Sequence, residues 1–216
     1  LAFQGQRQHY GQYFDLTTLS ADELALWKRE FLRFLKKLTL RTPKPIILKS
    51  PSHTYRIPLL LELFPNAKFV SISRDPYAVY NSTVHLRKTT FVENCLGVPN
   101  FEGLEDDTFV TYEHCIRRYE ATKTLIPAGN LHELRFEDLE VDPLGEMSRV
   151  YEQLNLPGWE RVAPAIREQM PQHAAYRKNR FSMDPETMRR IYQRLRFAFE
   201  CYGYPSRLSD LDEAAA

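Results

Sequence analysis

The sequence predicts an α/β fold in which a parallel sheet lies between layers of helices. A short apolar run at residues 46–48 and a second strand-like segment at residues 69–73 are separated by an apolar segment of helical length, residues 57–64. Two strands joined by such a helix form a right-handed unit with parallel strands. The turns that follow the two strands are therefore expected at one edge of the sheet, where open α/β sheets bind ligands.

The length and composition predict one domain over residues 1–216. A chain of 216 residues can bury a full core, and its net charge of +1 gives no support for a nucleic-acid-binding or membrane-surface protein. Three scattered cysteines fit neither a disulfide framework nor a metal site, so we expect reduced thiols and a cytoplasmic location. No apolar run is long enough to span a bilayer.

The first half of the chain carries clear helix and strand signals. Ser20 and Glu23 form the pattern of a capping box, which opens a helix expected over residues 21–38. This helix has an apolar stripe, and we interpret its opposite, basic side as a solvated surface. After the predicted strand 69–73, Asp75 suits an N-cap and Pro76 suits the first position of the next helix.

The second half alternates helical segments with one further strand. Residues 88–108 are rich in Gly, Pro and acidic residues, and we interpret them as a substrate loop or lid. We also expect a third strand at residues 131–136 and a disordered tail at residues 206–216. Four helices are expected in between, at residues 108–125, 144–154, 163–170 and 184–201.

Arg74 and Ser82 are candidates for an anion site. Arg74 ends the predicted strand, and Ser82 lies eight residues later on the following helix. A guanidinium fork and a hydroxyl beside a helix N-terminus can grip a phosphate. Alternatively, Arg74 forms a structural ion pair with Asp75 or Glu137, and Ser82 is a small packing residue.

Lys49 and His53 are candidates for catalysis. They follow the predicted strand 46–48, so they are expected beside Arg74 at the same sheet edge. A histidine can act as a general base near neutral pH, and a lysine can stabilise developing charge. The alternative is an exposed lysine and a histidine that packs in the turn. We assign no metal site, since no histidine pairs with carboxylates or thiols at ligand spacing.

These motifs resemble those of the sulfotransferases that use 3′-phosphoadenosine 5′-phosphosulfate (PAPS), in particular the bacterial-type branch. The similar segments are LKSPSH and FPNAKFVSISRDPYAVYNS. The resemblance implies a P-loop-like three-layer sandwich that transfers a sulfuryl group from PAPS to a hydroxyl or amine of a small-molecule or glycan acceptor, leaving adenosine 3′,5′-bisphosphate. It implies that Arg74 and Ser82 bind the 3′-phosphate and that Lys49 and His53 are the catalytic pair.

The resemblance extends downstream. The segment LRFEDL is similar to the family's Tyr-Glu-Asp-Leu segment, which places Phe136 near the adenine. Arg177 and Lys178 resemble the late basic loop that closes over the 3′-phosphate, with a solvated basic turn as the alternative. The family's Gly-rich loop for the 5′-phosphosulfate has no counterpart in residues 1–45, so we expect that its strand and loop are absent here.

The sequence is also compatible with two other functions. The chain is alternatively a non-catalytic nucleotide-binding or scaffold protein that retains this fold. A relative of the P-loop kinases is a weaker alternative, because nothing resembles a magnesium-binding strand end. The acceptor is not encoded in a recognisable motif, although residues 1–20 and 88–107 are expected to shape its site.

Overall fold

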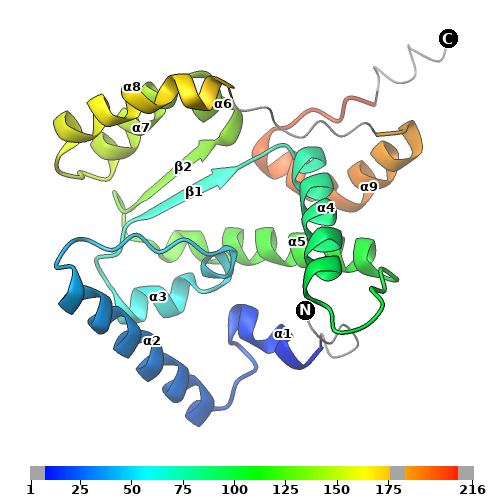
Figure 1. Cartoon of the computed structure of the whole chain (residues 1–216), viewed down its shortest axis with the longest axis horizontal. Coiled ribbons are helices and arrows are strands. Elements are labelled where there is room, and N and C mark those ends of the chain that lie inside the picture. Colours follow the sequence, from blue (N-terminus) through cyan, green and yellow to red (C-terminus); the bar gives the residue numbers. More distant parts are fainter. Residues whose placement is uncertain (1–7, 176–182, 209–216) are drawn as a thin grey trace.

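The computed structural model of the chain describes residues 8–175 and 183–208, which form a mostly helical α/β structure (Figure 1). A two-stranded parallel sheet lies within it. The helices, in chain order, are α1 (Gln8–Asp15), α2 (Ala21–Arg41), η2 (Pro51–Tyr55), α3 (Ile57–Leu63), α4 (Pro76–Asn94), α5 (Leu104–Thr122), η3 (Lys123–Leu125), α6 (Phe136–Val141), α7 (Pro143–Gln153), α8 (Trp159–Ala175) and α9 (Pro185–Tyr202), of which η2 and η3 are 3₁₀ helices.

Strands β1 (Phe69–Ser73) and β2 (Leu131–Arg135) pair in parallel. The register joins Phe69 to Leu131 at one end and Ser73 to Arg135 at the other. The connection between them runs through α4 and α5, which supplies the long crossover that parallel strands need. The predicted α/β class with a parallel sheet is confirmed at this level.

Helices cover both faces of this sheet (Figure 1). On one face, Phe69 and Leu131 pack against α3 and α5 in a cluster around Ile57 and Tyr119. On the other face, a second cluster joins β2 to α7 and consists of Leu134, Val150 and Leu154. This second layer reaches β2 but not β1, because Val70 and Ile72 remain 46% and 53% exposed.

The largest core cluster joins α4, α5 and α9. Tyr77 and Ile191 are fully buried in it, and Tyr80 stacks on Phe109 with ring centroids 4.4 Å apart. At the start of α4, the Asp75 side chain accepts a hydrogen bond from the Tyr77 N–H and Pro76 occupies the first turn, as the sequence predicts. The N-terminus of α4 is therefore held by a buried aromatic core at a fixed place after β1.

The strand expected at residues 46–48 is a correction, because these residues form no strand. Residues 42–50 run as an irregular segment, and Ile47 is 94% exposed. The run is only three residues long, and Pro45 and Pro51 prevent its extension into a regular ladder. The parallel unit of this structure is formed by β1 and β2 instead.

Other boundaries also differ from the sequence expectations. The loop expected at residues 88–108 shrinks to residues 95–103, because α4 continues past the buried Phe91 and α5 begins at Leu104. Helix α1 was not expected. Residues 206–208 lie against α4, where the Tyr77 hydroxyl donates to the Ser206 carbonyl. The helix at residues 21–38 is confirmed as the core of α2, with its capping box formed by Ser20 and Glu23.

We predict that Ile191→Ala and Ile47→Ala change stability by very different amounts. Ile191 is fully buried between α4, α5 and α9, so its truncation should cost about 2–5 kcal/mol of unfolding free energy. Ile47 is 94% exposed, so its truncation should change stability by less than about 0.5 kcal/mol. Urea unfolding of both variants measures the difference. A large loss for Ile47→Ala would indicate that residues 46–48 form a buried strand after all.

Candidate functional site

The carboxyl ends of β1 and β2 bring two predicted site residues together. Arg74 follows the last residue of β1, and Phe136 follows the last residue of β2, one position beyond the paired Ser73 and Arg135. The Arg74 guanidinium lies over the Phe136 ring, 4.3 Å from its centroid. A cation–π contact of this kind holds a guanidinium in place without neutralising its charge.

The carboxylates beside Arg74 have other partners. Asp75 pairs with Arg207. The Glu137 carboxylate accepts hydrogen bonds from the Asp75 N–H at 3.1 Å and from the Tyr204 hydroxyl at 2.7 Å. Among the described residues, Arg74 forms no ion pair with either carboxylate, which weakens the structural alternative considered from the sequence.

The hydrogen bonds to Glu137 also set its charge state. Burial alone would raise the pKa of the Glu137 carboxyl, but the bonds from the Asp75 N–H and the Tyr204 hydroxyl outweigh it. The pKa therefore lies below its ordinary value, and Glu137 is a carboxylate at neutral pH. It ties the start of α4 to the end of β2 and to the chain after α9.

The C-terminal segment contributes residues that the sequence did not reveal. Tyr204 is buried, and the Arg135 guanidinium lies 4.2 Å from its ring centroid. Arg207, besides pairing with Asp75, lies over the Tyr77 ring at 4.9 Å. Three arginines, Arg74, Arg135 and Arg207, thus surround the junction of β1, β2 and α4. No sequence motif marks the contact between Asp75 and Arg207, because the two are 132 positions apart.

Ser82 lies on the second turn of α4 with an exposed side chain. Its face of α4 is open, whereas Tyr77 and Tyr80 point into the core. Within the part of the chain that the structure describes, no hydrogen bond joins Ser82 to Arg74. The two residues are linked through the backbone of Asp75 and the first turns of α4.

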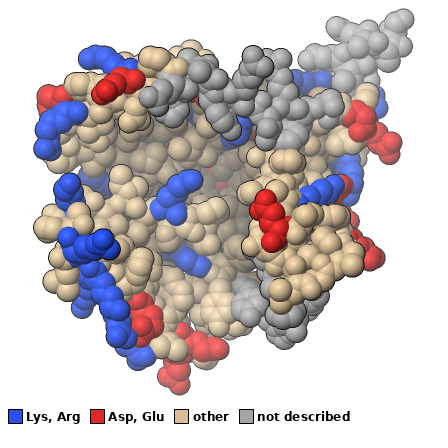
Figure 2. Space-filling model, viewed as in Figure 1, with Lys and Arg blue, Asp and Glu red and all other residues tan. Residues whose placement is uncertain are grey.

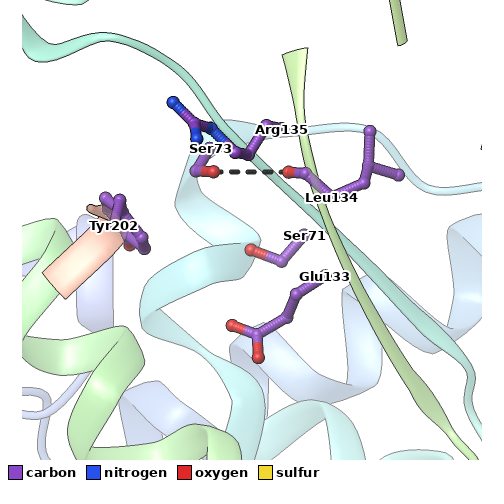
Figure 3. A pocket seen from close by; sticks show the side chains of 6 residues that line it. All are labelled: Ser71, Ser73, Glu133, Leu134, Arg135 and Tyr202. Carbon is purple, nitrogen blue, oxygen red and sulfur yellow. Dashed lines mark hydrogen bonds between the residues drawn. The ribbon is translucent and has the colours of Figure 1, made fainter. Parts of the chain in front are cut away.

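A small polar cavity of about 120 Å³ lies on one face of the two strands (Figure 3). Ser71 and Ser73 of β1 face it together with Glu133 and Arg135 of β2, and Tyr202 closes its far side. The Arg135 Nε is buried without a hydrogen-bond partner among the described residues. The cavity suits a few water molecules and is too small for a nucleotide, because ligand pockets typically measure about 300–1,000 Å³.

Lys49 and His53 do not lie at a strand end, which corrects the expected geometry. Lys49 is exposed on the irregular segment before η2, and His53 lies within η2. His53 is half-buried beside Phe31, with ring centroids 6.3 Å apart. Within the described residues, no hydrogen bond or ring contact joins either side chain to Arg74. The reason is the missing strand at residues 46–48, which would have placed both on the sheet edge.

Burial, helped by the charge of Arg56, lowers the pKa of the His53 imidazole below its ordinary value of 6.5. The neutral ring is therefore favoured at pH 7. The His53 Nδ1 is buried and has no hydrogen-bond partner among the described residues. The other predicted pair, Arg177 and Lys178, lies outside the described residues.

We predict that His53 titrates below pH 6.5 in the folded chain. The unfolded chain binds the proton more tightly, so protonation of His53 favours unfolding, and this stability loss grows as the pH falls through 6.5. NMR titration of the imidazole resonance measures the pKa directly. His53→Gln should remove that part of the acid destabilisation. The exposed His85 of α4 provides a matched control, since His85→Gln should leave the pH dependence of the His53 resonance unchanged. A His53 pKa above 6.5 would contradict the burial of this side chain.

Comparison with known proteins identifies the family. Residues 2–161 match the model of the sulfotransferase family, a range that includes Lys49, His53, Arg74, Ser82 and Phe136. No solved structure matches the chain.

Two curated relatives are omega-hydroxy-beta-dihydromenaquinone-9 sulfotransferases, named Stf3, from Mycobacterium bovis and Mycobacterium tuberculosis. Each is 37% identical over 204 residues, which cover 94% of this chain and 53% of the relative. The chain thus spans about half the length of these relatives. The family match over most of the chain, together with this identity, shows that the chain belongs to the sulfotransferase family.

Proposed function

We propose that this chain binds the 3′-phosphoadenosine part of PAPS and takes part in sulfuryl transfer to an acceptor hydroxyl. The observation that carries the proposal is the Arg74 guanidinium, which rests on the Phe136 ring while the adjacent carboxylates pair with other groups. A cation that is positioned but not neutralised suits a phosphate ligand. The family membership supports PAPS as the source of that phosphate.

The neighbours of Arg74 fit a nucleotide ligand. Ser82 offers an exposed hydroxyl on the helix that begins beside Arg74. Phe136 offers an aromatic ring on which adenine can stack, a contact worth about 1–3 kcal/mol per base. Arg177 and Lys178 would add further positive charge. The cavity in Figure 3 is not required, because its volume excludes a nucleotide.

His53 and Lys49 are the proposed catalytic residues. Bound PAPS supplies the sulfuryl group: the acceptor oxygen forms a bond to sulfur while the bond from sulfur to the phosphate oxygen breaks. His53, neutral at pH 7 because its pKa is lowered, takes the proton from the acceptor hydroxyl. Lys49 stabilises the negative charge on the departing phosphate oxygen. The mechanism requires that the segment carrying both residues come within reach of the strand ends.

The acceptor proposed is a hydroxyl on a menaquinone-like small molecule. The support is the name of the two mycobacterial relatives, which are omega-hydroxy-beta-dihydromenaquinone-9 sulfotransferases. We also propose that the chain forms one domain with the architecture of a P-loop-like three-layer sandwich.

The cytoplasmic location stays a prediction. Within the described residues, no helix has the length and apolar character needed to cross a membrane.

We predict that Arg74→Ala weakens the binding of adenosine 3′,5′-bisphosphate about tenfold to a hundredfold, the effect of losing a charge-assisted hydrogen bond. Isothermal titration calorimetry on the 216-residue chain measures it. Adenosine 5′-monophosphate, which lacks the 3′-phosphate, should bind the Arg74→Ala variant and the unchanged chain with similar affinity. Ser82→Ala should give a smaller loss of about two- to tenfold.

The matched control is Arg196→Ala, which removes an exposed arginine that pairs with Glu200 on α9. This variant should bind the bisphosphate as the unchanged chain does. An equal loss for Arg74→Ala and Arg196→Ala would show that Arg74 contributes only general positive charge.

We predict that His53→Ala and Lys49→Ala, in an active form of the enzyme, lower kcat by about 10²–10⁴-fold and leave bisphosphate affinity unchanged. Radiolabelled transfer assays measure kcat, and calorimetry measures affinity. Undiminished turnover in either variant would remove that residue from the mechanism. Tight bisphosphate binding without any transfer, even in a form as long as the relatives, would favour the non-catalytic nucleotide-binding alternative.

A further inference from the structure

Positive charge is segregated into one part of the chain. Residues 31–61 contain seven Lys and Arg residues and no Asp or Glu, although the net charge of the whole chain is only +1. The seven are Arg33, Lys36, Lys37, Arg41, Lys44, Lys49 and Arg56. Figure 2 shows Lys and Arg side chains along the left and lower left edge of the molecule, where Figure 1 places α2.

The same region exposes large apolar side chains. On α2, Phe34 is 55% exposed and Leu40 is 87% exposed. Leu35 is the buried residue of this helix, and at 100° per residue Arg33, Lys37 and Leu40 project to the opposite side. Ile47, on the irregular segment that follows α2, is 94% exposed. We call the exposed side of residues 33–47 the basic–apolar face.

A shallow hollow runs along this face. Its volume is about 400 Å³, and one helix supplies its lining: Arg29, Leu32, Arg33, Lys36, Lys37 and Leu40. Of the basic residues there, only Arg29 and Arg33 pair with a described carboxylate, that of Glu30. The charges of Lys36 and Lys37 are therefore available to an external partner.

We propose that the basic–apolar face binds the surface of an anionic lipid bilayer. Basic amphipathic helices lie in the membrane–water interface, where apolar side chains insert into the bilayer and Lys and Arg extend toward the lipid headgroups. Each Lys or Arg near an anionic membrane contributes about fivefold to the partition constant. The contact is peripheral, and it depends neither on the acceptor nor on nucleotide binding.

The composition of the face favours lipid over other partners. A nucleic-acid surface would use the cations but leave Phe34, Leu40 and Ile47 exposed to water. A second copy docked through the same face would bring Lys36 and Lys37 against like charges, which is unfavourable. An anionic bilayer satisfies both the cations and the apolar side chains.

Vesicle flotation tests the proposal with the 216-residue chain and no nucleotide present. The chain should bind vesicles of phosphatidylcholine mixed with phosphatidylglycerol, and not vesicles of phosphatidylcholine alone. Rising salt should weaken binding, because it screens the cations. Lys36→Glu combined with Lys37→Glu should reduce the partition constant about 25-fold or more, from two fivefold contributions. Leu40→Ser should reduce it about tenfold through lost insertion.

The matched control is Arg161→Glu combined with Arg167→Glu, which makes the same charge change on exposed positions of α8, across the sheet from α2 (Figure 1). This pair should keep vesicle binding. Equal losses for both pairs, or no binding of the unchanged chain to anionic vesicles, would overturn the proposal. Two other results would also overturn it. One is a dimer of the chain that the Lys36 and Lys37 substitutions dissociate. The other is binding to duplex DNA that Leu40→Ser leaves intact, with no binding to vesicles. Unaltered melting temperatures show that the variants fold.

Discussion

The parallel pairing of β1 with β2 is the constraint on which the candidate site depends. Its register places Ser73 beside Arg135, so the next residue of each strand, Arg74 and Phe136, emerges at the same edge. The backbone of Asp75 then donates to Glu137, which joins the start of α4 to the end of β2. A one-residue slip would turn every strand side chain to the other face and separate the guanidinium from the ring.

The second element of the site is the distribution of charge around Arg74. The carboxylates of Asp75 and Glu137 lie near Arg74, and either would neutralise the guanidinium by pairing with it. Asp75 instead pairs with Arg207, and Glu137 accepts hydrogen bonds from the Tyr204 hydroxyl and the Asp75 N–H. The chain after α9 therefore acts as a support for the strand ends. It provides an ion pair for Asp75 and a hydrogen bond for Glu137, and it leaves the Arg74 guanidinium available to a phosphate.

Local sequence signals predicted the elements that have a local cause. The capping box of Ser20 and Glu23 opens α2, and the segment at residues 69–73, with Val70 and Ile72, forms β1. The strand expected at residues 46–48 does not form, because a strand also needs a partner, and this short segment between prolines has none among the described residues. Arg74 and Phe136 were named separately, but their contact depends on register. The roles of Tyr204 and Arg207 arise from contacts between residues far apart in the sequence, which no local pattern encodes.

The net charge of the whole chain also gave no sign of the basic–apolar face, because acidic residues elsewhere offset its positive charge.

The proposed function rests on binding of the 3′-phosphoadenosine group at the ends of β1 and β2. The most direct measurement is an amide NMR titration of the isotope-labelled chain with adenosine 3′,5′-bisphosphate, assigned through β1, β2 and α4. We expect the largest chemical-shift changes on residues 74–82 and on Phe136, with small changes along α2 and α8. Saturable changes confined to other elements, with residues 74–82 unaffected, would contradict it.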